Sequence, residues 1–192
     1  MRWRKTMRKM IALSLFLLTA ILILSSTVSS QSLDSCPVQW VSASYGGIPY
    51  GAVVCGHESD GTPLYLARAY YNGGLHPGKV RSEFGSANIA YGDDEVKVNP
   101  YDVYCGGGMW VAASGGAVPA GAVICGYDTN GEPLYAARAY YAGGLQIGKV
   151  RPAFGGADIT YGGYEYTVNS YEVLCCAWDG PAYPSRPTMR VG

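Results

Sequence analysis

Short runs of alternating or β-branched residues, each bounded by Gly, Pro, Asn or Asp, follow one another along most of this chain. Residues 121–125 form one such run, which meets a polar turn at residues 128–131 and resumes at Leu134. The Asn-Gly pair that ends this turn, like Asp60-Gly61 earlier in the chain, is a strong signal for a β-hairpin. The pattern therefore predicts an all-β fold of short antiparallel strands.

Two segments of the sequence contain good helix formers and still favour strand. Residues 66–71 and 136–141 are short, and each lies between an upstream proline, Pro63 or Pro133, and a downstream Gly-Gly pair. Such a proline suits the beginning of a strand at a sheet edge or bulge. The Gly-Gly pair then opens a Gly-Gly-Leu-x-x-Gly-Lys-Val-Arg segment, which we interpret as a tight loop presenting a lysine.

The chain contains an internal duplication. Residues 40–105 and 110–175 align without a gap at an offset of 70, with 39 of 66 positions identical. We therefore expect two tandem homologous repeats related by pseudo-twofold symmetry, so that any special site occurs twice.

The beginning of the chain has the layout of a secretory signal peptide. Five Lys or Arg residues lie among the first nine, and an apolar run over residues 10–24 and a Ser-rich stretch to residue 30 follow. The apolar run is shorter than the roughly 20 residues of a membrane-spanning helix. The sequence predicts a signal peptide at 1–30, a lead-in at 31–39 and a Pro-rich tail at 176–192 in a secreted, extracellular protein; an uncleaved signal anchor is the alternative.

Charge argues against nucleic acid as a partner. Without residues 1–30 the chain keeps nine of its 14 Lys and Arg residues against 14 Asp and Glu, a net charge near −5. Such a chain has little electrostatic attraction for nucleic acid or anionic lipid.

All six cysteines follow the predicted signal peptide, and an even number in a secreted chain points to disulfides. Four of them occupy equivalent places in the two repeats: Cys55, Cys105, Cys125 and Cys175. Symmetry allows pairing within each repeat, which we favour, or an exchanged pattern between repeats. Cys36 and Cys176 flank the duplicated block and can form a third bridge. No Cys-x-x-Cys spacing is present and neither histidine recurs, so we expect no metal site.

The order of motifs resembles the DM-nine repeat family, whose module also occurs in natterin-type proteins. The motifs are Trp-Val, Pro-x-Gly-Ala-Val, Gly-x-Pro-Leu-Tyr-x-Ala-Arg, Gly-Lys-Val and a closing Tyr-Asp-Val or Tyr-Glu-Val, and all occur twice within residues 40–175. The resemblance implies a mannose-type lectin that recognises glycans on microbial or cell surfaces in innate immunity, and it allows a homodimer. It implies sugar contacts from Asp128 with Lys149 and from Glu58 with Lys79. The pore-forming module of natterin-type toxins is absent from this sequence, so membrane insertion is not expected.

An enzyme is not expected, because no serine, histidine and acid recur together and no phosphate-binding loop is present. We predict no cofactor. Arg68 and Arg138 lie among apolar residues and need acidic partners, for which Glu95 and Glu165 are candidates. The alternative to a lectin is an extracellular structural or protein-interaction module without sugar binding.

Overall fold

The computed structural model describes residues 36–176. The predicted signal peptide lies outside these residues, as do most of the lead-in and the tail beyond Cys176. Within the described part the fold is all-β, as predicted, with two short 3-10 turns, and no helix there is long and apolar enough to cross a membrane.

The two repeats contain the same series of strands. The first repeat contains β1 (Trp40–Ala43), β2 (Val54–His57), β3 (Pro63–Tyr71), β4 (Gly74–Val80), η1 (Ser82–Phe84), β5 (Ala87–Tyr91), β6 (Asp94–Val98) and β7 (Tyr101–Tyr104). The second contains β8 (Met109–Ser114), β9 (Ile124–Tyr127), β10 (Pro133–Tyr141), β11 (Gly144–Val150), η2 (Pro152–Phe154), β12 (Ala157–Tyr161), β13 (Tyr164–Val168) and β14 (Ser170–Cys175).

The local predictions hold at the hairpins. β2 and β3 are joined around Asp60, whose side chain accepts a hydrogen bond from the Thr62 amide at 2.9 Å. Pro63 is the first residue of β3, and the pairing of β2 with β3 shifts register just beyond it. The arginine-containing segments are strands. One interpretation was wrong: the Gly-Lys lysines lie on β4 and β11, whereas the tight turns precede these strands.

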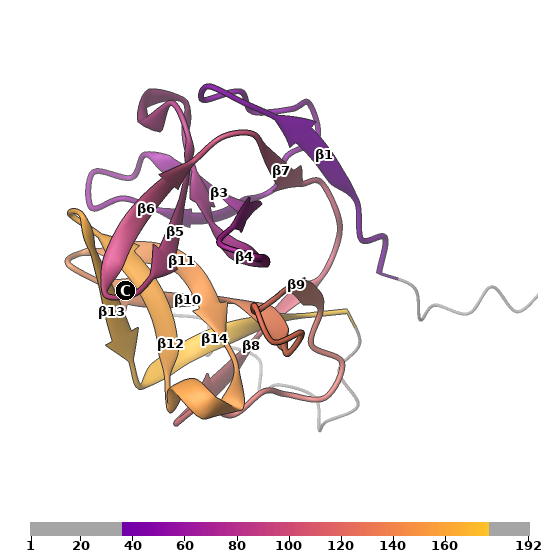
Figure 1. The fold of residues 1–192 in the computed structure, drawn as a ribbon, viewed down its shortest axis with the longest axis vertical. Helices are drawn as coiled ribbons and strands as arrows, with labels where there is room; N and C mark the ends of the chain where they lie inside the picture. The colour runs from indigo at the N-terminus through magenta and orange to yellow at the C-terminus, as the bar shows by residue number, and fades with distance from the viewer. Residues whose placement is uncertain (1–35, 177–192) are drawn as a thin grey trace, which may run out of the picture. The chain divides into compact units, whose positions relative to one another are not determined.

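The repeats exchange strand contacts. β2 of the first repeat pairs with β11 of the second, and β9 pairs in the same way with β4. β6 pairs with β13, so that β2, β3, β4, β5, β6, β13, β12 and β11 form a closed ring. Figure 1 shows β6 of the first repeat beside β13 of the second. A Cβ atom at Gly56 or at Gly126 would collide with the carbonyl oxygen of the leucine opposite, in β11 or in β4, so these crossings require glycine. The two repeats therefore form one intertwined unit.

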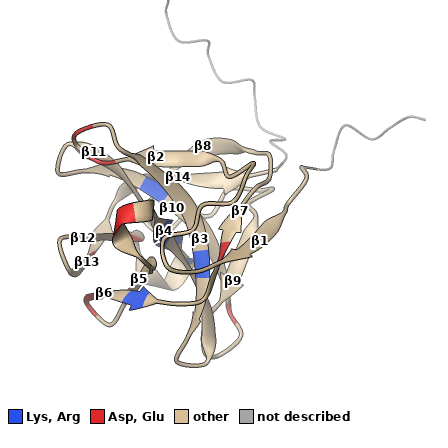
Figure 2. Ribbon diagram, turned by 90° about the horizontal axis from the view of Figure 1, so that it is seen from above, with Lys and Arg blue, Asp and Glu red and all other residues tan. Residues whose placement is uncertain are grey.

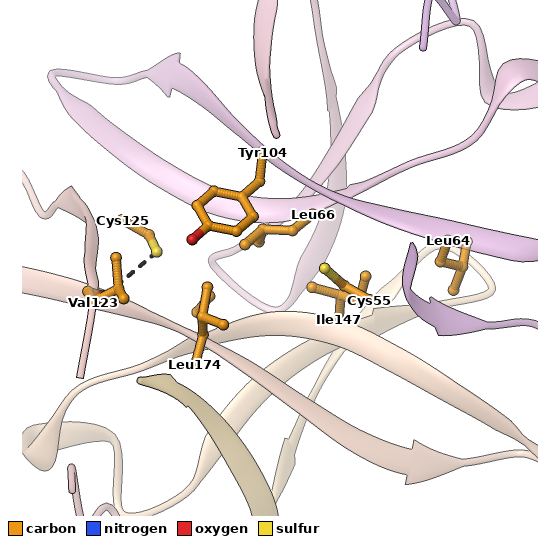
Figure 3. Close-up of a cluster of buried hydrophobic side chains, with 9 residues drawn as sticks. Cys55, Leu64, Leu66, Tyr104, Val123, Cys125, Ile147 and Leu174 are labelled. Carbon is orange, nitrogen blue, oxygen red and sulfur yellow. Dashed lines mark hydrogen bonds between the residues drawn. The ribbon is translucent and has the colours of Figure 1, made fainter. Parts of the chain in front are cut away.

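The central core lies between the repeats. It consists of Cys55, Leu64, Leu66, Tyr104, Val123, Cys125, Ala136, Ile147 and Leu174, all buried (Figure 3). Each repeat adds a smaller core of its own behind β3 or β10. Because residues of both repeats fill the central core, neither repeat can keep it buried alone.

The disulfide prediction was correct for the flanking pair and wrong for the repeats. Cys36 and Cys176 are bonded, whereas Cys55, Cys105, Cys125 and Cys175 are free thiols. The Cys55 thiol points into the central core, as Figure 3 shows, while half-buried Cys105 lies beyond the end of β7. Burial raises the pKa of the Cys55 thiol to about 11 and that of the Cys125 thiol to about 12, which keeps both protonated.

The two repeated arginines find partners other than those predicted. Arg68 forms an ion pair with Asp102 at 3.2 Å, and Arg138 forms one with Glu172 at 2.8 Å. Each guanidinium also lies over the ring of the tryptophan that opens its repeat, 4.1 Å from the Trp40 centroid in the first. Glu95 and Glu165 are instead used at the contact between the repeats, where each carboxylate accepts a backbone N–H from the other repeat.

Candidate functional site

The two repeated lysines are buried near the contact between the repeats. Lys79 lies on β4 and Lys149 on β11, and their exposed fractions are 2 % and 4 %. A buried ammonium group must be compensated by acceptors or opposite charge. How each lysine is compensated decides what each site can do.

Lys79 is held by three groups from both repeats. Its Nζ donates to Gln146 Oε1 and to the Thr160 carbonyl oxygen, both at 2.7 Å, and lies 3.6 Å from Glu95 Oε1. Gln146 and Thr160 belong to the second repeat, on β11 and β12. The site around Lys79 is therefore composite, and it exists only because the repeats interlock.

Glu58 joins this network through Gln146 and makes no direct ion pair with Lys79 within residues 36–176. Gln146 Nε2 donates to Glu58 Oε2 at 3.0 Å, while the oxygen of the same amide accepts from Lys79. The resemblance grouped Glu58 with Lys79, and the structure brings the two together with an amide between them. That amide fixes the half-buried carboxylate, which also reaches the surface.

A cavity of about 520 Å³ opens at this site. Its lining contains the charged side chains Glu58, Asp60, Lys79, Arg81, Glu95 and Lys97, the rings of Phe84 and Tyr161, and Ser59, Asn88, Gly162 and Gly163. The volume lies within the range of small-molecule sites. Acceptors, donors and aromatic rings thus line one cavity formed by both repeats. We call it the first pocket.

Burial and charge act against each other in this network. Burial lowers the pKa of Lys79, and the neighbouring Glu95 and Glu58 carboxylates oppose that change. Burial also raises the pKa of Glu95, but Lys79 and hydrogen bonds from Asn88 and Gly163 outweigh it and hold that pKa below its usual value. Glu95 is thus ionised at neutral pH.

The equivalent surroundings of Lys149 differ, and we call them the second site. Within residues 36–176, Lys149 Nζ makes no hydrogen bond; it lies 5.7 Å from the Tyr91 ring centroid and 5.5 Å from that of Phe154. Asp128, its predicted partner, forms an ion pair with Arg151 at 3.0 Å. The structure therefore places Asp128 near Lys149 but directs its carboxylate elsewhere.

His76 takes the place at the second site that Gln146 takes at the first. It is completely buried, and neither ring nitrogen has a hydrogen-bond partner among the described residues. Burial and the nearby Lys149 charge lower its pKa to about 4, so it is neutral at pH 7. Burial raises the pKa values of Asp158 and Glu165 close by. The His76 ring thus has no hydrogen-bond partner among residues 36–176, whereas the Gln146 amide in the first site bonds to both Lys79 and Glu58.

Reasoning from the sequence missed several residues of these sites. Gln146, His76, Asn88 and Asp158 were not singled out, because each differs between the copies and lies in the other repeat or on another strand. The sequence did contain a signal for these residues, because they differ between two otherwise similar repeats: Gln146 aligns with His76, and Asp158 aligns with Asn88. The recurrence of Glu95 and Glu165 was noticed but assigned to the arginines.

Comparisons with known proteins agree with this architecture. No curated protein matches the sequence. Among solved structures, the crystal structure of MFP2B, a nematode sperm cell motility protein, is similar, with a TM-score of 0.55 and 17 % identity over 78 % of this chain and 49 % of that one. The chain spans about half the length of that protein, and the likeness is one of fold.

The sequence profile of the DM9 repeat matches residues 23–98 and 69–167. These two overlapping segments cover more than half of the sequence and include every residue of the first pocket. The chain belongs to the DM9 repeat family.

Proposed function

We propose that this protein is a secreted carbohydrate-binding protein without catalytic activity, which recognises glycans through the two composite sites at the contact between its repeats. The observation that carries the proposal is the first pocket, where the Glu58–Gln146–Lys79–Glu95 network reaches a cavity of about 520 Å³. The predicted signal peptide supports secretion, and family membership supports recognition of mannose-type glycans on microbial or cell surfaces.

The chemistry of the first pocket suits a sugar. Vicinal hydroxyls both donate and accept, so a fixed carboxylate such as Glu58 can accept from one hydroxyl while a cation donates to its neighbour. Hydrogen bonds to charged groups are among the stronger polar contacts. The rings of Phe84 and Tyr161 in the lining offer an apolar surface for the C–H face of a sugar.

The second site is proposed to bind a sugar as well, through different side chains from those of the first pocket. Both ring nitrogens of His76 are buried without a hydrogen-bond partner among the described residues, and the Nζ of Lys149 makes no hydrogen bond there. A buried polar group without a hydrogen-bond partner raises the free energy of the folded protein. A ligand hydroxyl that bonded to such a group would remove that cost and so favour binding. Two sites in one chain would also raise the avidity for clustered glycans.

A glycan array of residues 31–192, followed by calorimetric titration of the best ligand, tests the proposal. The variants are Glu58→Gln for the first pocket and Asp128→Asn for the second site. Asp94→Asn, at an exposed carboxylate on β6 outside the first pocket, is the matched control. We expect Glu58→Gln to weaken binding at the first pocket at least about tenfold, because it removes a charge-assisted hydrogen bond.

The outcomes separate the alternatives. Binding to mannose-type glycans that is weakened by Glu58→Gln and unchanged by Asp94→Asn supports both the function and the pocket. Binding that neither site variant affects would keep a lectin but move its site. A folded chain that binds no glycan would refute the proposal and favour a structural or protein-interaction module.

A further inference from the structure

We infer that the first pocket takes an acidic saccharide, and that Arg81 and Lys97 bind its anionic group. The inference rests on the proposed carbohydrate-binding function and names the class of sugar at one of the two sites. It follows from two cationic side chains in the lining of the first pocket: Arg81, whose one ion pair is a long one to the exposed Glu83, and Lys97, which has none within residues 36–176.

The positions of these cations follow from the strand register. Lys79 on β4 lies opposite Asn88 on β5, and Asn88 lies opposite Lys97 on β6, so the three side chains form a row across one face. Arg81 follows Lys79 by two residues and points to the same side, since side chains alternate along an extended chain. Figure 2 shows the basic position on β6 at the edge of this region.

Each acid of the pocket accepts at least one hydrogen bond within the protein. Glu58 accepts from Gln146, Asp60 accepts from the Thr62 amide, and Glu95 accepts from Asn88 and from the Gly163 amide. Lys79 is likewise occupied by its three partners. Arg81 and Lys97 are the two cations of the lining that this network does not hold.

Arg81 and Lys97 lack comparable partners. Arg81 forms an ion pair with exposed Glu83 at 3.8 Å, a distance too long for a hydrogen bond, and its Nε, like that of Arg151, makes no hydrogen bond among the described residues. Lys97 is exposed and forms no ion pair within residues 36–176. A guanidinium and an ammonium that line one cavity suit a carboxylate or sulfate, since a planar guanidinium can bind two oxygens at once.

In the second repeat, the side chains at the two corresponding positions have partners within the protein. Arg151, the counterpart of Arg81, pairs with Asp128 and with Glu132. Thr167 stands at the position of Lys97 and donates to Asp158 Oδ1 at 2.8 Å. The two repeats contain the same series of strands, so this difference in side chains leads us to expect a preference for anions at the first pocket and not at the second site.

Two matched disaccharides test the inference: β-1,4-mannobiose and β-1,4-dimannuronate, in which the C6 hydroxymethyl group of each sugar is replaced by a carboxylate. A 6-sulfated mannobiose is the third probe, so that carboxylate and sulfate are told apart. Titrations use residues 31–192 and the variants Lys97→Thr and Arg81→Gln. Lys97→Thr introduces the residue of the second repeat at an exposed position and is expected to fold normally.

The wild type is expected to bind at least one acidic disaccharide about tenfold or more tightly than mannobiose. Lys97→Thr should reduce that preference to about twofold or less, by weakening the binding of the acidic disaccharide more than that of mannobiose. Binding of the acidic sugar should also weaken from 50 to 500 mM NaCl, by about tenfold or more, because exposed charges are screened.

Mannobiose bound as tightly as both acidic probes, or an acidic preference that survives both Lys97→Thr and Arg81→Gln, would overturn this inference and leave the proposed function standing. Failure to bind any of the three probes, together with an empty glycan array, would overturn both.

Discussion

Replacing Lys79 with methionine is expected to destabilise the protein far more than the same change at Lys149. The two lysines are equivalent in sequence, lie on equivalent strands and are almost equally buried. Methionine keeps much of the length and apolar volume of lysine, so the comparison isolates the ammonium group.

The magnitude follows from what each ammonium holds. Without Lys79, the Gln146 Oε1 and Thr160 carbonyl acceptors and the Glu95 carboxylate lose their shared donor. Removing one partner of a buried, hydrogen-bonded ion pair typically costs 3–5 kcal/mol, roughly, because the remaining charge is left uncompensated. Lys149 makes no hydrogen bond to the described residues, and burial lowers its pKa, so its charged form is costly to keep. We expect Lys149→Met to destabilise the protein less than Lys79→Met, because it breaks no hydrogen bond and removes only the attraction to Glu165, Asp158 and Asp128.

Guanidinium chloride unfolding at pH 7, followed by tryptophan fluorescence and circular dichroism without reductant, measures the difference. A loss of roughly 4 kcal/mol moves the midpoint of a domain of this size by about 1 M. Trp40 and Trp110 report on the two repeats. Equal destabilisation by both substitutions would contradict the asymmetry, and a neutral Lys79→Met would refute the network itself.

Three further predictions address stability. Reduction of the Cys36–Cys176 disulfide, which closes a loop of sequence separation 140, should cost up to about 5 kcal/mol, and alkylation of the denatured, unreduced protein should count four free thiols; two or none would contradict the structure. His76 has a folded pKa of about 4 against 6.5 unfolded, so its neutral form contributes about 3 kcal/mol that is present above pH 6.5 and lost as the pH falls toward 4. Acid titration of unfolding should show this loss, and His76→Gln, which installs the residue of the first site, should reduce it; an unchanged profile would show that His76 is not responsible. Ile147→Ala should cost 2–5 kcal/mol, roughly, in a single unfolding transition, whereas two separate transitions would mean that the repeats fold independently.

The sequence predicted the strands well, because their signals are local. The Asp60-Gly61 turn, the proline at the start of β3 and the Gly-Gly pair at the start of β4 each act on a few neighbouring residues. The pairing of β2 with β11 could not be predicted in the same way. Two homologous repeats offer each strand a similar partner twice, once within its own repeat and once in the other, and the local pattern does not distinguish the two.

The candidate site was predicted in its residues and not in its geometry. Lys79 and Glu58 do belong to one site, but the amide that joins them comes from Gln146, 88 positions beyond Glu58 in the sequence. The expectation of a lysine presented on a loop was wrong because the chain turns at residues 72–73 and β4 already begins at the second glycine of the pair. Lys79 therefore lies on the strand, where it contacts the other repeat. The same crossing places Cys55 in the central core, away from Cys105.

Strand exchange changes what a duplication can do for function. In two separate repeats, a substitution would alter only the site of its own copy. Here Gln146 belongs to the second repeat and completes the site of Lys79, while His76 belongs to the first and lies at the site of Lys149. Each site therefore combines a lysine from one copy with a neighbour from the other, and the two can diverge through single changes that leave the ring of strands intact. The positions of Lys97 and Thr167, which follow one backbone plan and differ in charge, are a further case of such divergence.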